Sequence, residues 1–270
     1  MVWMEAEMAG AGVPRASDAT DPAPVTVLNE SGSSPVVLLC EHASNHIPVR
    51  YQGLGLQPPD LSRHIAWDIG VAQVARNLSV ALDAPLALSG YSRLLIDCNR
   101  PLGVPSSIPE ISELTEIPGN RDLSQAERDE RATLYYWPFQ HAVAALLDAR
   151  QRQQRPTMVL GVHSFTPVFK GFVRPWHGGV LFRRAQALGN ALVAALREPG
   201  LVVEANQPYQ ITDGGDYTVP VHGEARGLDA VLVEIRQDLI LDAAGIESWS
   251  ARLTRALGEL VGSSRFPRAT

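Results

Sequence analysis

Short apolar runs alternate with helical patterns along most of this chain, and this alternation restricts the fold more than any other feature of the sequence. Six runs have the length and composition of buried strands. They are PVVLLC (35–40), LALSG (86–90), LLIDC (94–98), TMVLGV (157–162), LVVE (201–204) and AVLVEI (230–235). Helical patterns separate most of them, which predicts an α/β fold with a mainly parallel or mixed central sheet between layers of helices.

Four segments carry the apolar spacing or the capping residues of helices. In residues 67–82 the apolar side chains keep to one helical face. The sequence SQAE at 124–127 matches a capping box, which predicts a helix from there to about residue 152. Two further helices are expected at about 181–197 and 245–261.

The 270 residues contain no internal repeat and no obvious linker, so we expect a single α/β domain over residues 26–270. Residues 1–25 are rich in Ala, Gly, Pro and acidic residues and lack the basic start and apolar core of a signal peptide, which predicts a flexible leader. Residues 101–121 contain four prolines and no clear period. A loop of that length in a compact domain is usually a functional flap or disordered.

The charge and the cysteine content exclude several classes of partner. A formal net charge of −6 argues against nucleic acid or an anionic membrane as the main partner. No apolar run is long enough to span a membrane. The chain has two cysteines, Cys40 and Cys98, which are too few for a disulfide framework, so a reduced, cytoplasmic setting is expected.

Four of the apolar runs are followed or closed by side chains that can take part in chemistry. These are Glu41, His42 and Asn45 after the first run, then Asp97, Asn99 and Arg100, then His163 and Ser164, and finally Glu234, Arg236, Gln237 and Asp238. The carboxyl ends of parallel strands meet at one edge of a sheet. If all four runs are parallel strands, His42 and His163 therefore meet in one crevice.

The combined side chains suit a metal-dependent hydrolase. Two imidazoles and a carboxylate are the protein ligands of a catalytic zinc, which keeps a fourth position for water. The metal lowers the pKa of that water to about 7, and a further carboxylate can carry its proton to the leaving nitrogen. Arginine binds a carboxylate through two parallel hydrogen bonds. The set therefore predicts metal-dependent hydrolysis of a small acidic amide.

Each of these side chains also has a structural interpretation. A single histidine after a strand is more often a hydrogen-bonded polar residue than a ligand, and this interpretation is kept for His46, His64, His141 and His177. Asp97 has a structural alternative as the partner of Arg93 or Arg100. An unpaired carboxylate within an apolar strand costs several kcal/mol, so Glu234 needs either a structural arginine such as Arg236 or a role in an active site.

Six stretches, taken in order, carry a more specific signal than any single cluster. They are CEHASNHIP, HIAWDIG, YSRLLIDCNRP, GVHSFTPVFKGFVRPWHGGVLF, NQPYQITDGGDYTVPVHGEARGL and VEIRQDLI. Together they resemble the N-formylglutamate amidohydrolase family, over about residues 35–242. The resemblance implies a zinc-dependent hydrolase with the three-layer α/β/α architecture of the zinc exopeptidases, related to carboxypeptidases and aminoacylases.

The resemblance also implies roles for single residues. It places the first metal-binding histidine at His42 and the later one at His163. The pair that binds the substrate carboxylate falls on Asn99 and Arg100, and the general base falls on Glu234. The implied cofactor is one divalent ion, zinc.

One position departs from the wider exopeptidase pattern. The metal-binding glutamate expected three residues after the first histidine is Asn45 here, and an amide oxygen is a poor zinc ligand. We predict that Asp68, in the HIAWDIG motif, is the third ligand, because it would start a helix beside the first strand. Glu41 and Asn45 are the alternatives.

The resemblance implies a small acidic N-acyl amino acid, such as N-formylglutamate, as the substrate. Arg174 and Arg236 are expected to help Asn99 and Arg100 bind its carboxylate. Two other functions are considered. One is a different zinc hydrolase of the aminoacylase or carboxypeptidase kind that acts on larger substrates, and the other is a catalytically silent protein that binds acidic amino acids.

Overall fold

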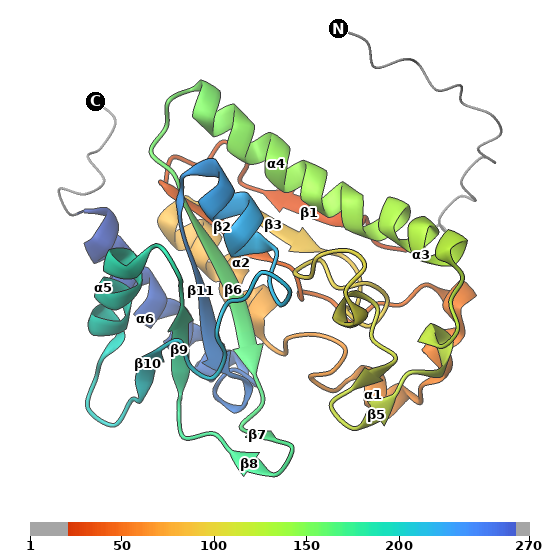
Figure 1. Ribbon diagram of the computed structural model, residues 1–270. Coiled ribbons are helices and arrows are strands. Elements are labelled where there is room, and N and C mark those ends of the chain that lie inside the picture. Colours follow the sequence, from red (N-terminus) through yellow and green to blue (C-terminus); the bar gives the residue numbers. More distant parts are fainter. Residues whose placement is uncertain (1–20, 263–270) are drawn as a thin grey trace, which may run out of the picture.

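The computed structural model describes residues 21–262, which form a mixed sheet of seven strands in the order β1-β3-β2-β6-β11-β9-β10 (Figure 1). The strands are β1 (Val25–Leu28), β2 (Val36–Cys40), β3 (Leu86–Ser89), β6 (Met158–Phe165), β9 (Gly178–Leu181), β10 (Val203–Ala205) and β11 (Asp229–Arg236). The four central strands β3, β2, β6 and β11 are parallel, whereas β1 is antiparallel to β3 and β9 is antiparallel to β11. This is the mixed sheet that the sequence predicts.

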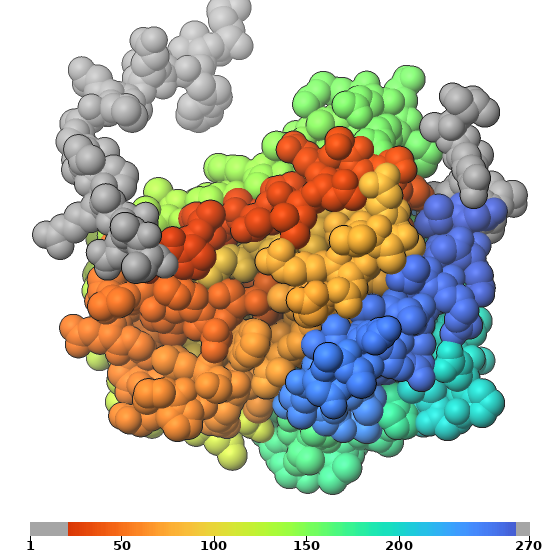
Figure 2. All heavy atoms as spheres, turned by 180° about the vertical axis from the view of Figure 1, so that it is seen from behind, coloured from red at the N-terminus to blue at the C-terminus, as the bar shows by residue number. Residues whose placement is uncertain are grey.

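Helices cover both faces of the sheet. The helices are α1 (Pro58–Leu61), α2 (Val71–Leu82), α3 (Gln125–Arg131), α4 (Trp137–Arg152), α5 (Gln186–Leu196) and α6 (Ala243–Val261). One face packs against α2, α5 and α6, with α2 beside α6 (Figure 2), and the other packs against α4 (Figure 1). Successive side chains of a strand point to opposite faces of the sheet. Leu38 of β2 therefore joins the core between the sheet and α2, α5 and α6, and Leu39 joins the core between the sheet and α4. The predicted three-layer α/β/α architecture is therefore confirmed.

The predicted helix over 124–152 is present, with one irregularity. It begins with a full capping box, in which Ser124 Oγ accepts from the Glu127 N–H and the Ser124 N–H donates to the Glu127 carboxylate. Residues Ala132–Tyr136 form a π-helical turn between α3 and α4. The turn buries Tyr135 and Tyr136 in the core below α4.

The predicted strand LLIDC is wrong, because residues 94–98 form turns and irregular backbone rather than a strand. Ser92 starts the turn: its Oγ accepts from the Leu94 N–H at 3.2 Å and its carbonyl accepts from the Leu95 N–H at 3.0 Å. Strand β2 is already paired with β3 and β6, and β3 is paired with β2 and β1. Neither strand has a free edge for a further partner, so Leu94 and Leu95 are buried as core side chains instead.

The loop over 101–121 is ordered and contains small elements. Within this loop, strands β4 (Ile111–Ser112) and β5 (Thr115–Glu116) form a short hairpin. A second hairpin, outside this loop, joins β7 (Val168–Phe169) to β8 (Phe172–Val173). The remaining elements are the 3₁₀ or π turns η1 (Val49–Gly55), η2 (Pro105–Ser107), η3 (Pro118–Asn120), η5 (Thr218–Gly223), η6 (Glu224–Arg226) and η7 (Gln237–Leu239).

The predicted leader falls mostly on residues 1–20, which lie outside the described part of the chain. Its last residues contact the sheet: the Pro24 carbonyl accepts from the Gly90 N–H at 3.0 Å, and the Pro22 carbonyl accepts from the Tyr91 hydroxyl at 2.7 Å. Both cysteines are buried as free thiols, Cys40 at the end of β2 and Cys98 in the turn after β3. No helix among residues 21–262 is both long enough and apolar enough to cross a membrane.

Candidate metal centre

Strands β2 and β6 bring His42 and His163 into contact. His42 lies two residues beyond the end of β2, and His163 lies near the carboxyl end of the parallel neighbour β6. Both side chains are buried, and their Nδ1 atoms are 3.2 Å apart. The convergence expected from parallel strand ends is therefore observed for this pair.

Asp68 completes the group, although it does not start a helix as expected. Helix α2 begins at Val71, because Gly70 before it adopts a left-handed φ of 83°, which is not helical. Only glycine fits at position 70, because a Cβ there would clash with the Ile240 carbonyl. Asp68 therefore lies in the segment before the helix, where its N–H donates to the His42 carbonyl at 3.0 Å. Its Oδ2 is 3.0 Å from His163 Nδ1 and 3.4 Å from His42 Nδ1.

The three side chains fit a divalent metal ion. Among the described residues they are the group of potential ligands whose donor atoms all lie within 4.8 Å of one another, and all three are buried. Two imidazole nitrogens and a carboxylate oxygen suit zinc. Burial alone would raise the pKa of Asp68, but the charges and hydrogen bonds of His42 and His163 hold it well below its ordinary value, so the carboxylate stays ionised.

The two alternative ligands lie elsewhere. The Asn45 side chain donates from Nδ2 to the Leu61 carbonyl at 2.9 Å. Glu41 is buried on the far side of His163, where its Oε2 is 3.1 Å from His163 Nε2. Neither side chain joins the group formed by His42, Asp68 and His163.

Arg93 and Asp97 surround the group with further charges. Asp97 Oδ1 is 2.7 Å from His42 Nε2, and Arg93 donates from Nη2 to Asp97 Oδ2 at 2.8 Å. Arg93 also reaches Asp68 Oδ1 with Nη1, at 3.4 Å. Asp97 is therefore paired with Arg93, which is one of the two structural partners predicted for it, and it also fixes His42.

Glu234 lies beside His163 without a structural partner. It is on β11 in direct register with His163 of β6, it is buried, and its Oε2 has no hydrogen bond within residues 21–262. Burial raises its pKa to about 7. The expected alternative, a pair with Arg236, is not formed, because Arg236 binds Asp238 at 2.8 Å and approaches the Trp176 carbonyl at 3.4 Å.

A cavity of about 400 Å³ opens in front of this group. Its wall includes His42, Asp68, Arg93, Asp97, Asn99, Arg100, Glu113, His163, Tyr209, Asp216 and Glu234. Arg100 donates to the Asn99 carbonyl at 3.1 Å and forms no ion pair with a described residue, so its guanidinium retains free donors. Asn99 lines the same wall, but its Oδ1 already accepts from the N–H groups of Tyr217 and Thr218, both at 3.0 Å.

The other two arginines expected at the substrate do not line this cavity. Arg174 is buried behind the wall, where its guanidinium lies 4.7 Å from the Phe169 ring centre and 4.8 Å from that of Tyr209. Arg236 is held by Asp238 on the outer side of Arg174, whose carbonyl is 3.5 Å from Arg236 Nη1. Arg174 therefore supports Phe169 and Tyr209, which themselves line the cavity.

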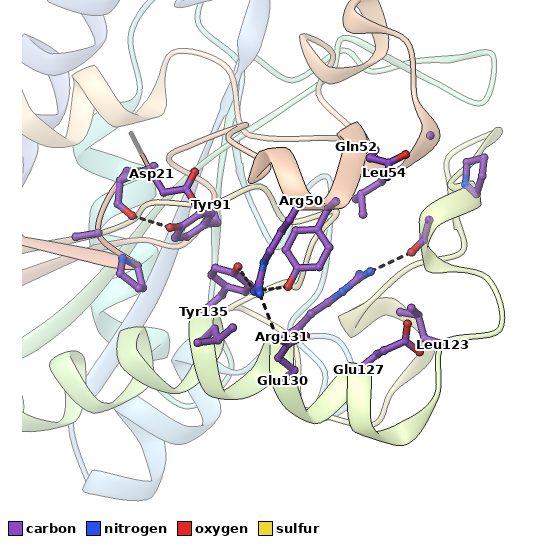
Figure 3. A pocket seen from close by; sticks show the side chains of 18 residues that line it. Asp21, Arg50, Gln52, Leu54, Tyr91, Leu123, Glu127, Glu130, Arg131 and Tyr135 are labelled. Carbon is purple, nitrogen blue, oxygen red and sulfur yellow. Dashed lines mark hydrogen bonds and ion pairs between the residues drawn. The ribbon is translucent and has the colours of Figure 1, made fainter. Parts of the chain in front are cut away.

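A larger cavity of about 1250 Å³ lies elsewhere, between the 21–24 segment, η1 and α3 (Figure 3). Its polar side chains are bonded to one another: Arg50 donates to the hydroxyls of Tyr51 at 2.7 Å and Tyr135 at 2.6 Å, and pairs with Glu130 at 3.1 Å. No group of three potential metal ligands lies along the described part of its wall. The smaller cavity is therefore the candidate active site.

The sequence does not identify several residues of the smaller cavity, among them Glu113, Tyr209 and Asp216, and it suggests only a structural role for Arg93. Glu113 lies in the proline-rich segment whose expected alternatives include a functional flap. Tyr209 and Asp216 lie within NQPYQITDGGDYTV, one of the stretches that carry the family resemblance. Position within these motifs is therefore the signal that could have identified them.

Comparisons with known proteins show the family and the fold of the chain. The family model for N-formylglutamate amidohydrolase matches residues 34–241. The crystal structure of gene product Atu2144 from Agrobacterium tumefaciens is 39% identical, with a TM-score of 0.87 over 90% of this chain and 97% of that one. The N-formylglutamate amidohydrolase from Ralstonia eutropha JMP134 has the same fold, with a TM-score of 0.68 and 21% identity over 90% of this chain and 99% of that one. No curated protein matches the sequence.

Proposed function

The chain belongs to the N-formylglutamate amidohydrolase family, and we propose that it is a metal-dependent hydrolase of a small acidic N-acyl amino acid such as N-formylglutamate. The observation that carries this proposal is the buried group of His42, Asp68 and His163, with the unpaired carboxylate of Glu234 in the wall of the same cavity. A binding protein without catalytic activity would gain nothing from a buried, unpaired carboxylate at that place, because such a group is destabilising.

His42 and His163, each through Nδ1, and Asp68, through Oδ2, would hold one divalent ion, which we propose is zinc. Such an ion supplies a Lewis acid that polarises the amide carbonyl and activates water. The residues of the chain orient and desolvate this centre: Asp97 holds His42, and Arg93 offsets the negative charge of Asp68 and Asp97.

Glu234 would move the proton. Burial raises the pKa of this carboxylate to about 7 in the metal-free protein, and we propose that it accepts a proton from water and returns it to the leaving nitrogen. Its place beside His163, in register on the neighbouring strand, puts the carboxylate close to the proposed ligands.

Arg100 would bind the substrate carboxylate. It lines the cavity and has no acidic partner among the described residues, so binding a carboxylate does not require breaking an ion pair. We assign the direct contact to Arg100 because Arg174 and Arg236 lie outside the wall. The Oδ1 of Asn99 accepts from the backbone, and its Nδ2, 3.4 Å from Asp216 Oδ1, is a second donor in the same wall. A cavity of about 400 Å³ favours a small substrate over the larger ones of carboxypeptidases.

The test is a substrate screen with the zinc-loaded protein. N-formylglutamate, N-acetylglutamate, their diamides, in which both carboxyl groups are replaced by uncharged amides, and a short peptide are compared by the release of free amine. We expect hydrolysis of the N-acylglutamates, loss of activity with a chelator and recovery with zinc. Metal-loaded protein that binds N-acylglutamate without hydrolysing it would instead identify a binding protein, and a preference for the peptide would identify a carboxypeptidase-like enzyme.

A further inference from the structure

The two histidines of the candidate metal centre are each held from behind by a carboxylate. His42 Nε2 contacts Asp97 at 2.7 Å, and His163 Nε2 forms an ion pair with Glu41 at 3.1 Å. A carboxylate on one ring nitrogen of a histidine sets the orientation of the ring and the tautomer that it adopts. Both contacts therefore turn Nδ1 toward the proposed metal position.

The two contacts differ in how well they are aligned. The bond from His42 to Asp97 has hydrogen-bond geometry, whereas Glu41 Oε2 and His163 Nε2 are close enough for an ion pair but lack it. Glu41 thus depends on a second partner to keep its place. The hydroxyl of Thr218, at the start of η5, donates to Glu41 Oε1 and is that partner.

Asn99 connects Asp97, which holds His42, to Thr218, which holds Glu41. Its N–H donates to Asp97 Oδ1 at 2.8 Å, and its Oδ1 accepts from the Thr218 N–H at 3.0 Å. A continuous chain of polar contacts therefore runs from His42 through Asp97, Asn99, Thr218 and Glu41 to His163. All six side chains are buried, with exposures of 1–3%.

We propose that Asn99, Thr218 and Glu41 are positioning residues, which hold the His163 ring in register with His42 and thereby set the affinity for the metal. This inference rests on the proposed function only in taking His42 and His163 as metal ligands. It gives the Oδ1 and the backbone N–H of Asn99 a positioning role, and it leaves Nδ2, 3.4 Å from Asp216 Oδ1, as the donor for the substrate contact implied by the family resemblance. Loss of an outer-shell partner of this kind typically weakens metal binding about 10–100-fold.

The test compares Thr218→Val with Thr218→Ser. Valine keeps the shape but removes the hydroxyl that holds Glu41, whereas serine keeps the hydroxyl. Zinc affinity is measured by competition with a chromophoric chelator on the full chain, and we expect Thr218→Val to bind about 10–100-fold more weakly and Thr218→Ser to bind like the parent. Thr157→Val is the matched control, because it removes a bonded hydroxyl, 3.0 Å from Arg150 Nε, far from the cavity.

A second measurement does not depend on the metal. In crystal structures of the metal-free variants, the His163 ring is expected to leave its present orientation in Thr218→Val and to keep it in Thr218→Ser. If Thr218→Val does not fold, Glu41→Gln replaces it, with the same expected loss of affinity and of ring orientation. The inference is overturned if the folded variant keeps both the ring orientation and the parent's zinc affinity. Absence of zinc binding in the parent would contradict the proposed function, and the ring orientation would then decide the positioning role by itself.

Discussion

At the scale of single residues, two of the buried carboxylates in the cavity wall, those of Asp68 and Glu234, have pKa values that are moved in opposite directions. Burial would raise both, but His42 and His163 hold the pKa of Asp68 well below its ordinary value, whereas burial raises that of Glu234 to about 7. Such a separation is how one site keeps a charged ligand beside a group that exchanges protons at neutral pH.

Replacement of Glu234 by Gln tests the proton-transfer role. Glutamine has nearly the same shape but cannot take up the proton, so kcat should fall by roughly 10²–10⁴-fold. Zinc content and melting temperature should not fall, because no described residue pairs with Glu234 Oε2. A metal-loaded Gln variant with full activity would exclude Glu234 as the base, and a variant that loses stability instead would indicate a structural role.

The raised pKa of Glu234 also makes stability depend on pH. The unfolded chain releases this proton near pH 4.5 and the folded chain near pH 7, so folding loses stability between these values as the pH rises. In the metal-free protein, the unfolding free energy of the parent should therefore fall relative to Glu234→Gln from about pH 4.5 to 7 and then stay level. Urea unfolding of both proteins at intervals of one pH unit measures the difference, and a difference independent of pH would contradict the expected shift.

The third ligand is tested with a pair of variants. Asp68→Asn keeps the shape but removes the charge next to both histidines, so zinc affinity should fall by more than the roughly 10–100-fold typical of outer-shell partners. Asn45→Ala is the matched control, because its side chain binds the Leu61 carbonyl and should leave zinc affinity unchanged. Chelator competition measures both, and the reverse pattern would assign the ligand to Asn45.

Arg100 is tested through the kind of donor that it offers. Arg100→Lys keeps the charge but loses the paired donors, so kcat/KM for an N-acylglutamate should fall by roughly ten-fold or more. The diamide counterpart, which carries no carboxylate, should be affected less. Equal losses on the two substrates would mean that Arg100 does not recognise the substrate carboxylate.

Residue identity made part of the site predictable. His42, His163 and Glu234 follow or close apolar runs, which put them among the candidate residues, and the family resemblance then implied the role of each. Glu41 and Thr218 were not predictable in their present roles, because the direction of each side chain depends on how η5 packs against β6 and β11. Sequence spacing alone does not determine such contacts.

At the scale of elements, two hairpins form the mouth of the cavity and one side chain joins them. Glu113, in the turn between β4 and β5, is 3.3 Å from Arg63 Nη2 and 3.2 Å from His64 Nε2. Its Oε1 also accepts from the N–H of Lys170, in the turn between β7 and β8, at 3.4 Å. Of the two alternatives expected for residues 101–121, this ordered arrangement around the cavity favours a functional flap.

Replacement of Glu113 by Ala should separate the hairpins. Loss of these contacts should raise KM several-fold with little change in kcat, because the hairpins enclose the cavity but lie outside the proposed ligand group. Trypsin should also cleave faster after Lys170, which lies in the released turn. Unchanged KM together with an unchanged cleavage rate would show that Glu113 does not hold the mouth closed.

Strands were predictable where burial decides them. Helices cover both faces of the sheet at β2, β6 and β11, so these strands are apolar along most of their length. Their apolar composition is the feature that identified them in the sequence. Strand β9 (Gly178–Leu181) was not among the predicted strands. Gly179 lets the Gln207 carbonyl approach to a place that a Cβ would occupy, and the sequence shows the glycine but not which segment comes near it.

At the scale of the whole molecule, the order of the strands determines where a site can form. β2, β6 and β11 are the middle of the sheet, and α2, α4, α5 and α6 cover its two faces. The carboxyl edge of these three strands is where the cavity opens, bounded by loops that connect distant parts of the chain. The proposed ligands and base can therefore meet only after β11, close to the end of the described chain, has inserted beside β6.

The two buried cysteines can report local opening of the proposed site. Cys40 directly precedes Glu41, and Cys98 directly follows Asp97, so each thiol adjoins a carboxylate that holds one of the histidines. Burial, together with neighbouring carboxylates, raises the pKa of both thiols, which leaves almost no thiolate to react in the folded protein. Alkylation of either cysteine therefore requires local opening of the segment that supports a histidine. The rate of alkylation of each cysteine therefore measures how often the segment that supports His42 or His163 opens locally.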